Sequence, residues 1–184
     1  ASTISIVKRA YLAGGTSLAL QIGHRTSVDL DFFTMEKFDE NVVATGLSRF
    51  REFKEGTRDW ATVLGWIGET KFSIFYYEPK LIDKLIPFEG IQLASKKDIS
   101  AMKLHAISDR GLKRDFVDVF FLAKEFSLDE MCEFYLKKYG REDMLYSVIK
   151  GLEYFNDAID NMPRMLVPVD WEDIKEFFRK ETKR

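Results

Sequence analysis

The chain has 184 residues, of which 46% are hydrophobic and 16 are Phe, so we expect one domain, or a core with a closely packed helical extension. Charged residues make up 32% and the net charge is −2, which excludes an overall polycation and limits any nucleic-acid contact to a local basic patch. A single cysteine excludes an intramolecular disulfide framework, and no apolar stretch approaches the roughly 20 residues that span a bilayer, so we expect a soluble, cytoplasmic protein without membrane contact.

Short strand-like patterns dominate the chain before about residue 95. The apolar spacing predicts strands at 11–13, 28–33 and 91–94, helices at 16–22 and from Asp39 to about Phe53, and a hairpin of 58–67 and 70–77. Gly68-Glu69 suits a two-residue type II′ turn in that hairpin. The helix after Asp39 is expected to bury an apolar stripe of Val42, Val43, Leu47 and Phe50.

Long helical patterns follow residue 95. Ser95 or Lys96 is predicted to open a helix that runs to about Asp109 and ends at Gly111. Further helices are predicted at 113–126, 128–139, 142–160 and 171–180. Strands first and helices after indicate an α+β fold: a small mixed β-sheet with helices at 1–95, followed by a helical C-terminal half at 96–184 packed on that core.

A glycine-rich turn precedes a strand that carries two aspartates. Gly14 and Gly15 let the backbone approach an anionic group closely, and the amides that open the next helix can donate to phosphate oxygens. Asp29 and Asp31 stand in alternate positions and are therefore expected on one face of a strand. Two carboxylates so placed could share one divalent ion, so the segment suggests metal-assisted chemistry on a nucleotide.

Lys103 stands in the apolar stripe of its predicted helix, four residues from both Ile99 and Ile107. Asp115 and Asp118 are the acids of the next helix, which is otherwise apolar nearly all round. Buried charges need partners, so these residues form either a structural ion pair between two helices or a phosphate-binding lysine beside a reacting carboxylate. The aspartates of the preceding strand favour the second interpretation.

With these motifs, the chain resembles the AbiEii-type nucleotidyltransferase toxins of bacterial toxin–antitoxin and abortive-infection pairs, within the polymerase-β-like superfamily. The resemblance rests on Gly-Gly-Thr-Ser-Leu-Ala-Leu at 14–20, on Arg25-x-Ser27-x-Asp29-x-Asp31, and on Lys103, Arg110 and Arg114-Asp115-x-x-Asp118. These motifs fall within residues 12–122, about two-thirds of the chain, in the order of the family.

The resemblance implies a nucleotidyltransferase-like core and an Mg²⁺-dependent enzyme that transfers a nucleoside monophosphate from an NTP to an acceptor and releases pyrophosphate. The acceptor would be the 3′ end of tRNA or a protein, and a cognate antitoxin would be a partner. Asp29 and Asp31 would hold Mg²⁺, Lys103 would contact phosphate, and Asp118 would be a further catalytic acid. The nucleotide would be bound by Gly14, Gly15, Thr16, Ser17, Arg25 and Ser27.

Two features leave alternatives open. Enzymes of the superfamily usually take a third acid from a neighbouring strand, but the predicted strand at 70–77 offers Ser73 at that place. Either Asp115 or Asp118 completes the site, or the chain is a catalytically degenerate module that binds a nucleotide or a partner. Arg25 suits phosphate, but it could instead pair with Asp29 or Asp31, and His24 is expected to be structural.

Overall fold

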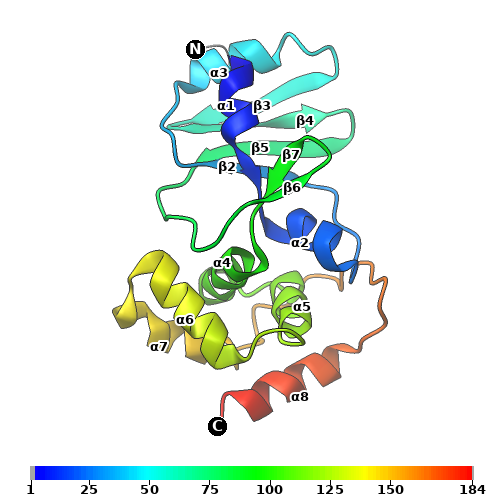
Figure 1. Cartoon of the computed structure of the whole chain (residues 1–184). Coiled ribbons are helices and arrows are strands. Elements are labelled where there is room, and N and C mark those ends of the chain that lie inside the picture. The colour runs from blue at the N-terminus through cyan, green and yellow to red at the C-terminus, as the bar shows by residue number, and fades with distance from the viewer. Residues whose placement is uncertain (1–2, 184) are drawn as a thin grey trace. The chain divides into compact units, whose positions relative to one another are not determined.

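The computed structural model describes residues 3–183, and its contacts divide the chain into two compact units (Figure 1). Unit 1 comprises the chain up to Ser17 together with Val28–Lys80 and Leu85–Ala94. Unit 2 comprises Leu18–Ser27, Leu81–Lys84 and the chain from Ser95 onward. Each unit is therefore built from three separate stretches of sequence.

Unit 1 is a seven-stranded mixed sheet with the strand order β3-β4-β5-β2-β1-β7-β6. The pairs β2–β5 and β1–β7 are parallel, and the other neighbours are antiparallel. The strands are β1 (Tyr11–Leu12), β2 (Leu30–Thr34), β3 (Phe53–Asp59), β4 (Thr62–Ile67), β5 (Thr70–Tyr76), β6 (Ile86–Phe88) and β7 (Ile91–Leu93).

Two helices, α1 (Thr3–Arg9) and α3 (Glu40–Leu47), cover one face of this sheet (Figure 1). Alternate residues of the strands point into the core beneath the helices, because successive side chains of a strand point to opposite faces. The core there includes Ile6, Phe32, Val43, Leu47, Phe72 and Ile74. Asp31 lies between the core position Phe32 and Leu30, so its side chain projects from the opposite face.

Unit 2 is helical. Its helices are α4 (Lys96–Asp109), α5 (Lys113–Leu122), α6 (Leu128–Tyr139), α7 (Glu142–Gly151) and α8 (Trp171–Glu181). Phe116 of α5 makes ring contacts with Phe155, Trp171 and Phe178, which fixes α8 against α5. The helix α2 (Gly14–Ile22) contributes its first residues to unit 1 and its remainder to unit 2.

The α+β class with a mixed sheet is confirmed, and so are the Asp39 and Ser95 helix caps. The hairpin turn at Gly68-Glu69 is also confirmed, since φ is +60° at Gly68 and Glu69 has no positive φ, as a type II′ turn requires. Among the described residues, no helix is long and apolar enough to cross a membrane.

Several predicted boundaries were wrong. The range 58–67 is not one strand, because the chain turns at Trp60-Ala61 and separates β3 from β4. Strand β2 begins only at Leu30, so Asp29 lies just before it. Three predicted helices end early, at Leu47, Leu122 and Gly151, and Val42 and Phe50 of the expected apolar stripe are exposed. The elements α1, β3 and β6 were not predicted.

Candidate functional site

The glycine turn of unit 1 packs directly on the strand that carries Asp31. The backbone N–H of Ala13 donates to the Asp31 carbonyl oxygen at 3.0 Å. Gly14 has φ of +67°, a region that a side chain rarely adopts, and a methyl group built on it would lie 3.8 Å from Asp31 Oδ2. The Asp31 carboxylate therefore lies beside the turn.

Asp29 is held to the start of α2. The Thr16 hydroxyl donates to the Asp29 carbonyl oxygen at 2.5 Å, so this hydroxyl ties the helix to the segment that leads into β2. The side chains of Thr16 and Ser17 are buried, whereas Gly14 and Gly15 are half-buried. Within this turn the glycine backbone is thus more accessible than the two hydroxyl side chains.

Asp29 and Asp31 are both half-buried, so solvent or a ligand can reach this part of the chain. Their carboxylates are the hard oxygen donors that Mg²⁺ prefers, and Mg²⁺ is commonly held by one or two carboxylates plus waters and substrate phosphates. Ser73 lies opposite Asp31 in the register of β2 and β5 and is buried. The residues that the structure describes contain no group of three or more His, Cys, Asp or Glu able to hold a metal. The donor set therefore fits Mg²⁺ with substrate and water as the remaining ligands.

A second cluster, in unit 2, surrounds the fully buried Asp118. Asp118 Oδ1 accepts from His24 Nε2 at 2.7 Å and from Arg25 Nε at 2.7 Å. Asp118 Oδ2 accepts from Arg25 Nη2 at 2.8 Å and contacts Lys103 Nζ at 2.6 Å. Arg25 thus binds the carboxylate in a bidentate manner, with two parallel hydrogen bonds, which is the strongest form of an arginine–carboxylate pair.

Lys103 joins Asp118 to Asp115. Lys103 Nζ lies 2.9 Å from Asp115 Oδ1, and Arg110 donates to both Asp115 oxygens at 2.9 and 3.0 Å. The spacing of Asp115 and Asp118 places them on one side of α5, facing Lys103 of α4. In this cluster three cations face two carboxylates, which leaves one net positive charge.

The cluster keeps both carboxyl groups ionised. Burial alone would raise the pKa of Asp118, but the charge of Lys103 and the hydrogen bonds from Arg25 and His24 outweigh it, so this pKa lies well below its usual range. Burial opposes ionisation of Asp115 in the same way, and the charge of Lys103 together with Arg110 lowers the pKa of that carboxyl.

His24 and Arg25 are placed by the loop that follows α2. Gly23 ends that helix with φ of +62°, and the backbone of 24–26 then pairs with the distant segment 164–167. Thr26 N–H donates to Arg164 O, and the N–H groups of Leu166 and Val167 donate to His24 O. These bonds hold the two side chains over α5.

The structure thus brings together Lys103, Asp115, Asp118 and Arg25 within unit 2, and the glycine turn, Asp29 and Asp31 within unit 1. Arg25 pairs with Asp118, which corrects the suggestion that it pairs with Asp29 or Asp31. Ser27 is half-buried on the loop after Arg25. The contact between His24 and Asp118 was not predicted, because 94 residues separate them in the sequence.

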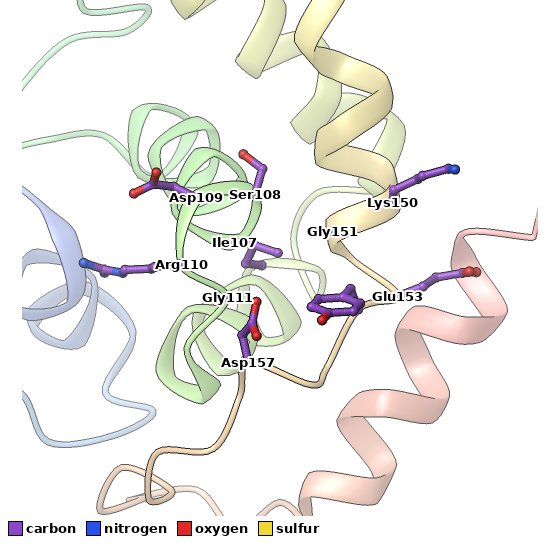
Figure 2. A pocket seen from close by; sticks show the side chains of 10 residues that line it. Ile107, Ser108, Asp109, Arg110, Gly111, Lys150, Gly151, Glu153 and Asp157 are labelled. Carbon is purple, nitrogen blue, oxygen red and sulfur yellow. The ribbon is translucent and has the colours of Figure 1, made fainter.

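A surface cavity of about 440 Å³ lies in unit 2 where α4 and α7 end (Figure 2). The side chains of Asp109 and Arg110 extend away from Asp157, and Lys150 also points outward. Arg110 is bound to Asp115. The cavity therefore presents a carboxylate and no converging cation, which does not suit a phosphate group.

Comparison with known proteins gives a consistent result. A family model described as nucleotidyl transferase AbiEii toxin, Type IV TA system, matches residues 6–75 and 73–184. An uncharacterised protein of Aquifex aeolicus (strain VF5) is 34% identical over 187 residues, which cover 98% of this chain and 90% of the relative.

Two crystal structures from Helicobacter pylori share the fold. One is described as a candidate nucleotidyltransferase, with 22% identity, a TM-score of 0.58, and coverage of 98% of this chain and 89% of the other. The second is the protein JHP933, with 22% identity, a TM-score of 0.56, and coverage of 98% and 87%.

Proposed function

Because this chain belongs to the AbiEii nucleotidyl transferase toxin family, we propose that it transfers a nucleoside monophosphate from an NTP to an acceptor and releases pyrophosphate. The observation that carries the proposal is the packing of the Gly14 turn against Asp31. A backbone able to approach phosphate oxygens then lies beside a pair of carboxylates able to bind a divalent ion.

Asp29 and Asp31 are the residues that would hold Mg²⁺. When bound, the ion would neutralise charge on the phosphates and lower the pKa of an attacking hydroxyl. The glycine turn would donate backbone N–H groups to the phosphates of the NTP. These residues act by position and charge, which is how proteins catalyse phosphoryl-type transfers in general.

Within unit 2, Lys103 and Arg25 would supply positive charge for an anionic ligand. Each is almost fully buried and is fixed by carboxylates, so its position does not depend on solvent. The net positive charge of the Arg25, Lys103, Arg110, Asp115 and Asp118 cluster supports an anionic ligand at unit 2.

The acceptor and the partner are further parts of the proposal. The family description supports a toxin with a cognate antitoxin, and the acceptor would be the 3′ end of tRNA or a protein. A test incubates the chain with each labelled NTP, Mg²⁺ and either total tRNA or a protein mixture. We expect label on one of the two acceptor classes.

The variants Asp29→Asn and Asp31→Asn should each reduce transfer by at least about 100-fold, because mutations at charge-stabilising catalytic groups cost 10²–10³ in rate. Asp173→Asn, an exposed aspartate on α8, is the matched control and should keep the wild-type rate. Equal transfer by all four proteins would reject the proposal.

The alternative is a nucleotide-binding or partner-binding module without turnover. It is favoured by the buried Ser73 opposite Asp31, where a carboxylate would otherwise complete an acidic triad. Calorimetry that shows NTP binding, together with no transfer to any acceptor, would establish this alternative.

A further inference from the structure

Both oxygens of the Asp118 carboxylate are engaged by groups of the protein. A carboxylate has about four acceptor positions on its two oxygens. His24 and Arg25 donate to Oδ1, Arg25 also donates to Oδ2, and the Lys103 ammonium forms an ion pair with Oδ2 at 2.6 Å. With no accessible surface and both oxygens held by three protein cations or donors, Asp118 cannot bind a metal ion or take a proton from a substrate hydroxyl in this arrangement.

His24 donates to Asp118 through one ring nitrogen and leaves the other without a partner among the described residues. A carboxylate only accepts, so His24 Nε2 carries the proton, and among the described residues the buried Nδ1 has no hydrogen-bond partner. An N–H at Nδ1 would be buried without an acceptor. The His24 ring lies 5.1 Å from the Phe121 ring, which fixes its orientation. His24 thus leaves one buried polar atom unsatisfied in order to donate to Asp118.

The two cations gain a fixed position from this arrangement. Arg25 meets Asp118 through Nε and Nη2, and its Nη1 donates to the Thr26 carbonyl oxygen. Lys103 donates a hydrogen bond to Asp115 Oδ1 and forms an ion pair with Asp118 Oδ2. An ammonium group has three N–H donors, and among the described residues Lys103 contacts no acceptor beyond Asp115 and Asp118, so donor capacity remains for an anion.

We propose that His24 and Asp118 are positioning residues: the His24 Nε2–H fixes the Asp118 carboxylate, and that carboxylate fixes Arg25 and Lys103 to bind the polyphosphate of the substrate. Asp118 then acts through the two cations and not as an acid, a base or a metal ligand. The proposal rests on the proposed function for the identity of the anion, a nucleoside triphosphate. The binding of a polyphosphate can nevertheless be measured without any turnover.

The test measures binding of inorganic tripolyphosphate by calorimetry in EDTA, so that neither a metal nor an acceptor is needed. Asp118→Asn should weaken binding at least about tenfold, because Arg25 and Lys103 lose their anchor. The opposite sign is expected if Asp118 is only a metal ligand or a base, because removing a negative charge near an anion site strengthens anion binding. Unchanged or tighter binding by Asp118→Asn would overturn the proposal.

A pair of variants tests His24. His24→Gln can place an amide N–H near the former Nε2 and should retain binding within about threefold, whereas the shorter His24→Asn should lose about tenfold. Equal binding by the two variants would contradict the role of the Nε2–H. If circular dichroism shows that Asp118→Asn does not fold, the two His24 variants still test the positioning role. Tripolyphosphate binding with this pattern but no nucleotidyl transfer would reject the proposed function and keep the positioning role.

Discussion

Single residues show how the cluster around Asp118 balances two large and opposed effects. Removing a carboxylate from water is costly, and Asp115 and Asp118 are both fully buried. Lys103, Arg25 and Arg110 offset that cost only while all of them are present, since each carboxylate is shared by at least two cations. Loss of one member should therefore cost more than an isolated ion pair would suggest.

We expect Lys103→Met to lower the free energy of unfolding by about 3–5 kcal/mol, because it leaves two buried carboxylates with reduced compensation. Arg141→Met is the matched control, since Arg141 pairs with Asp143 on the surface and such pairs contribute about 0–1 kcal/mol. Urea unfolding at neutral pH measures both. A similar decrease in the free energy of unfolding in the two variants would show that the buried cluster contributes no more to stability than a surface ion pair.

The lowered pKa values of Asp115 and Asp118 predict a loss of stability in acid. A carboxyl whose pKa is lower in the folded state stabilises the fold fully above the unfolded pKa of about 3.9, and this stabilisation is lost as the pH falls below it. Asp115→Asn removes one such group. The stability difference between the wild type and this variant should therefore shrink from about pH 6 to about pH 3 in urea unfolding. A constant difference would contradict the assignment.

The sequence predicted which residues belong to the buried cluster better than it predicted which of them form pairs. Lys103 interrupted an apolar stripe and two acids interrupted an apolar helix, so their mutual contact could be anticipated from helical spacing. The pairing of Arg25 with Asp118 could not, because nothing local links residues 93 apart. The roles of the site residues in binding and catalysis stay predictions.

Secondary-structure elements were predictable where apolar residues recur with the period of a strand or a helix. They were not predictable at the edges of the sheet, where this periodicity is lost. β5 was predicted together with its turn, and β4, in which buried Val63 and Gly65 alternate with more exposed residues, was predicted as the end of a longer strand. β3 is an edge strand whose residues after Phe53 are exposed, and β6 is a short edge strand containing Pro87, so neither has an alternating burial pattern. α3 ends at Leu47, although Phe50 extends its apolar spacing, because Gly46 and Ser48 favour termination.

The glycine turn gives a prediction at the element scale. Gly14→Ala and Gly23→Ala should each cost roughly 1–2 kcal/mol, because both glycines have positive φ values near +65°. Only the methyl group at 14 would lie beside the Asp31 carboxylate, whereas nothing lies within 4 Å of one at 23. Urea unfolding should show similar losses, but only Gly14→Ala should reduce the rate of nucleotidyl transfer. Equal transfer rates for the two variants would show that the glycine turn is not part of the active site.

The molecule as a whole is assembled from interleaved stretches. Contacts assign 18–27 and 81–84 to the helical unit although strands surround them in sequence. The short loop at Ile82 and Asp83 is tied there by its backbone N–H groups, which donate to the buried Asp98, itself paired with Lys138. A change in amino-acid composition along the sequence cannot reveal that these two segments belong to the helical unit. Their assignment depends on side chains that come into contact only after folding.

Ligands should stabilise this molecule measurably. A ligand at 100 times its Kd adds about 2.7 kcal/mol, which for a chain of this size raises Tm by roughly 5–10 °C. We expect an Mg²⁺–NTP mixture to produce such a rise in differential scanning fluorimetry. The double variant Asp29→Asn/Asp31→Asn should lose the Mg²⁺-dependent part, while Asp173→Asn keeps it. The absence of any shift with every NTP would contradict nucleotide binding by this chain.

The long separation between Arg25 and Asp118 has a consequence for the synthesis of the protein. A nascent chain presents the glycine turn, Asp29 and Asp31 early, but Arg25 and Lys103 meet their common carboxylate only after residue 118 has been added. A fragment that ends before that point carries Asp29 and Asp31 but lacks the carboxylate that joins Arg25 to Lys103. The complete cluster therefore forms only in chains translated beyond residue 118.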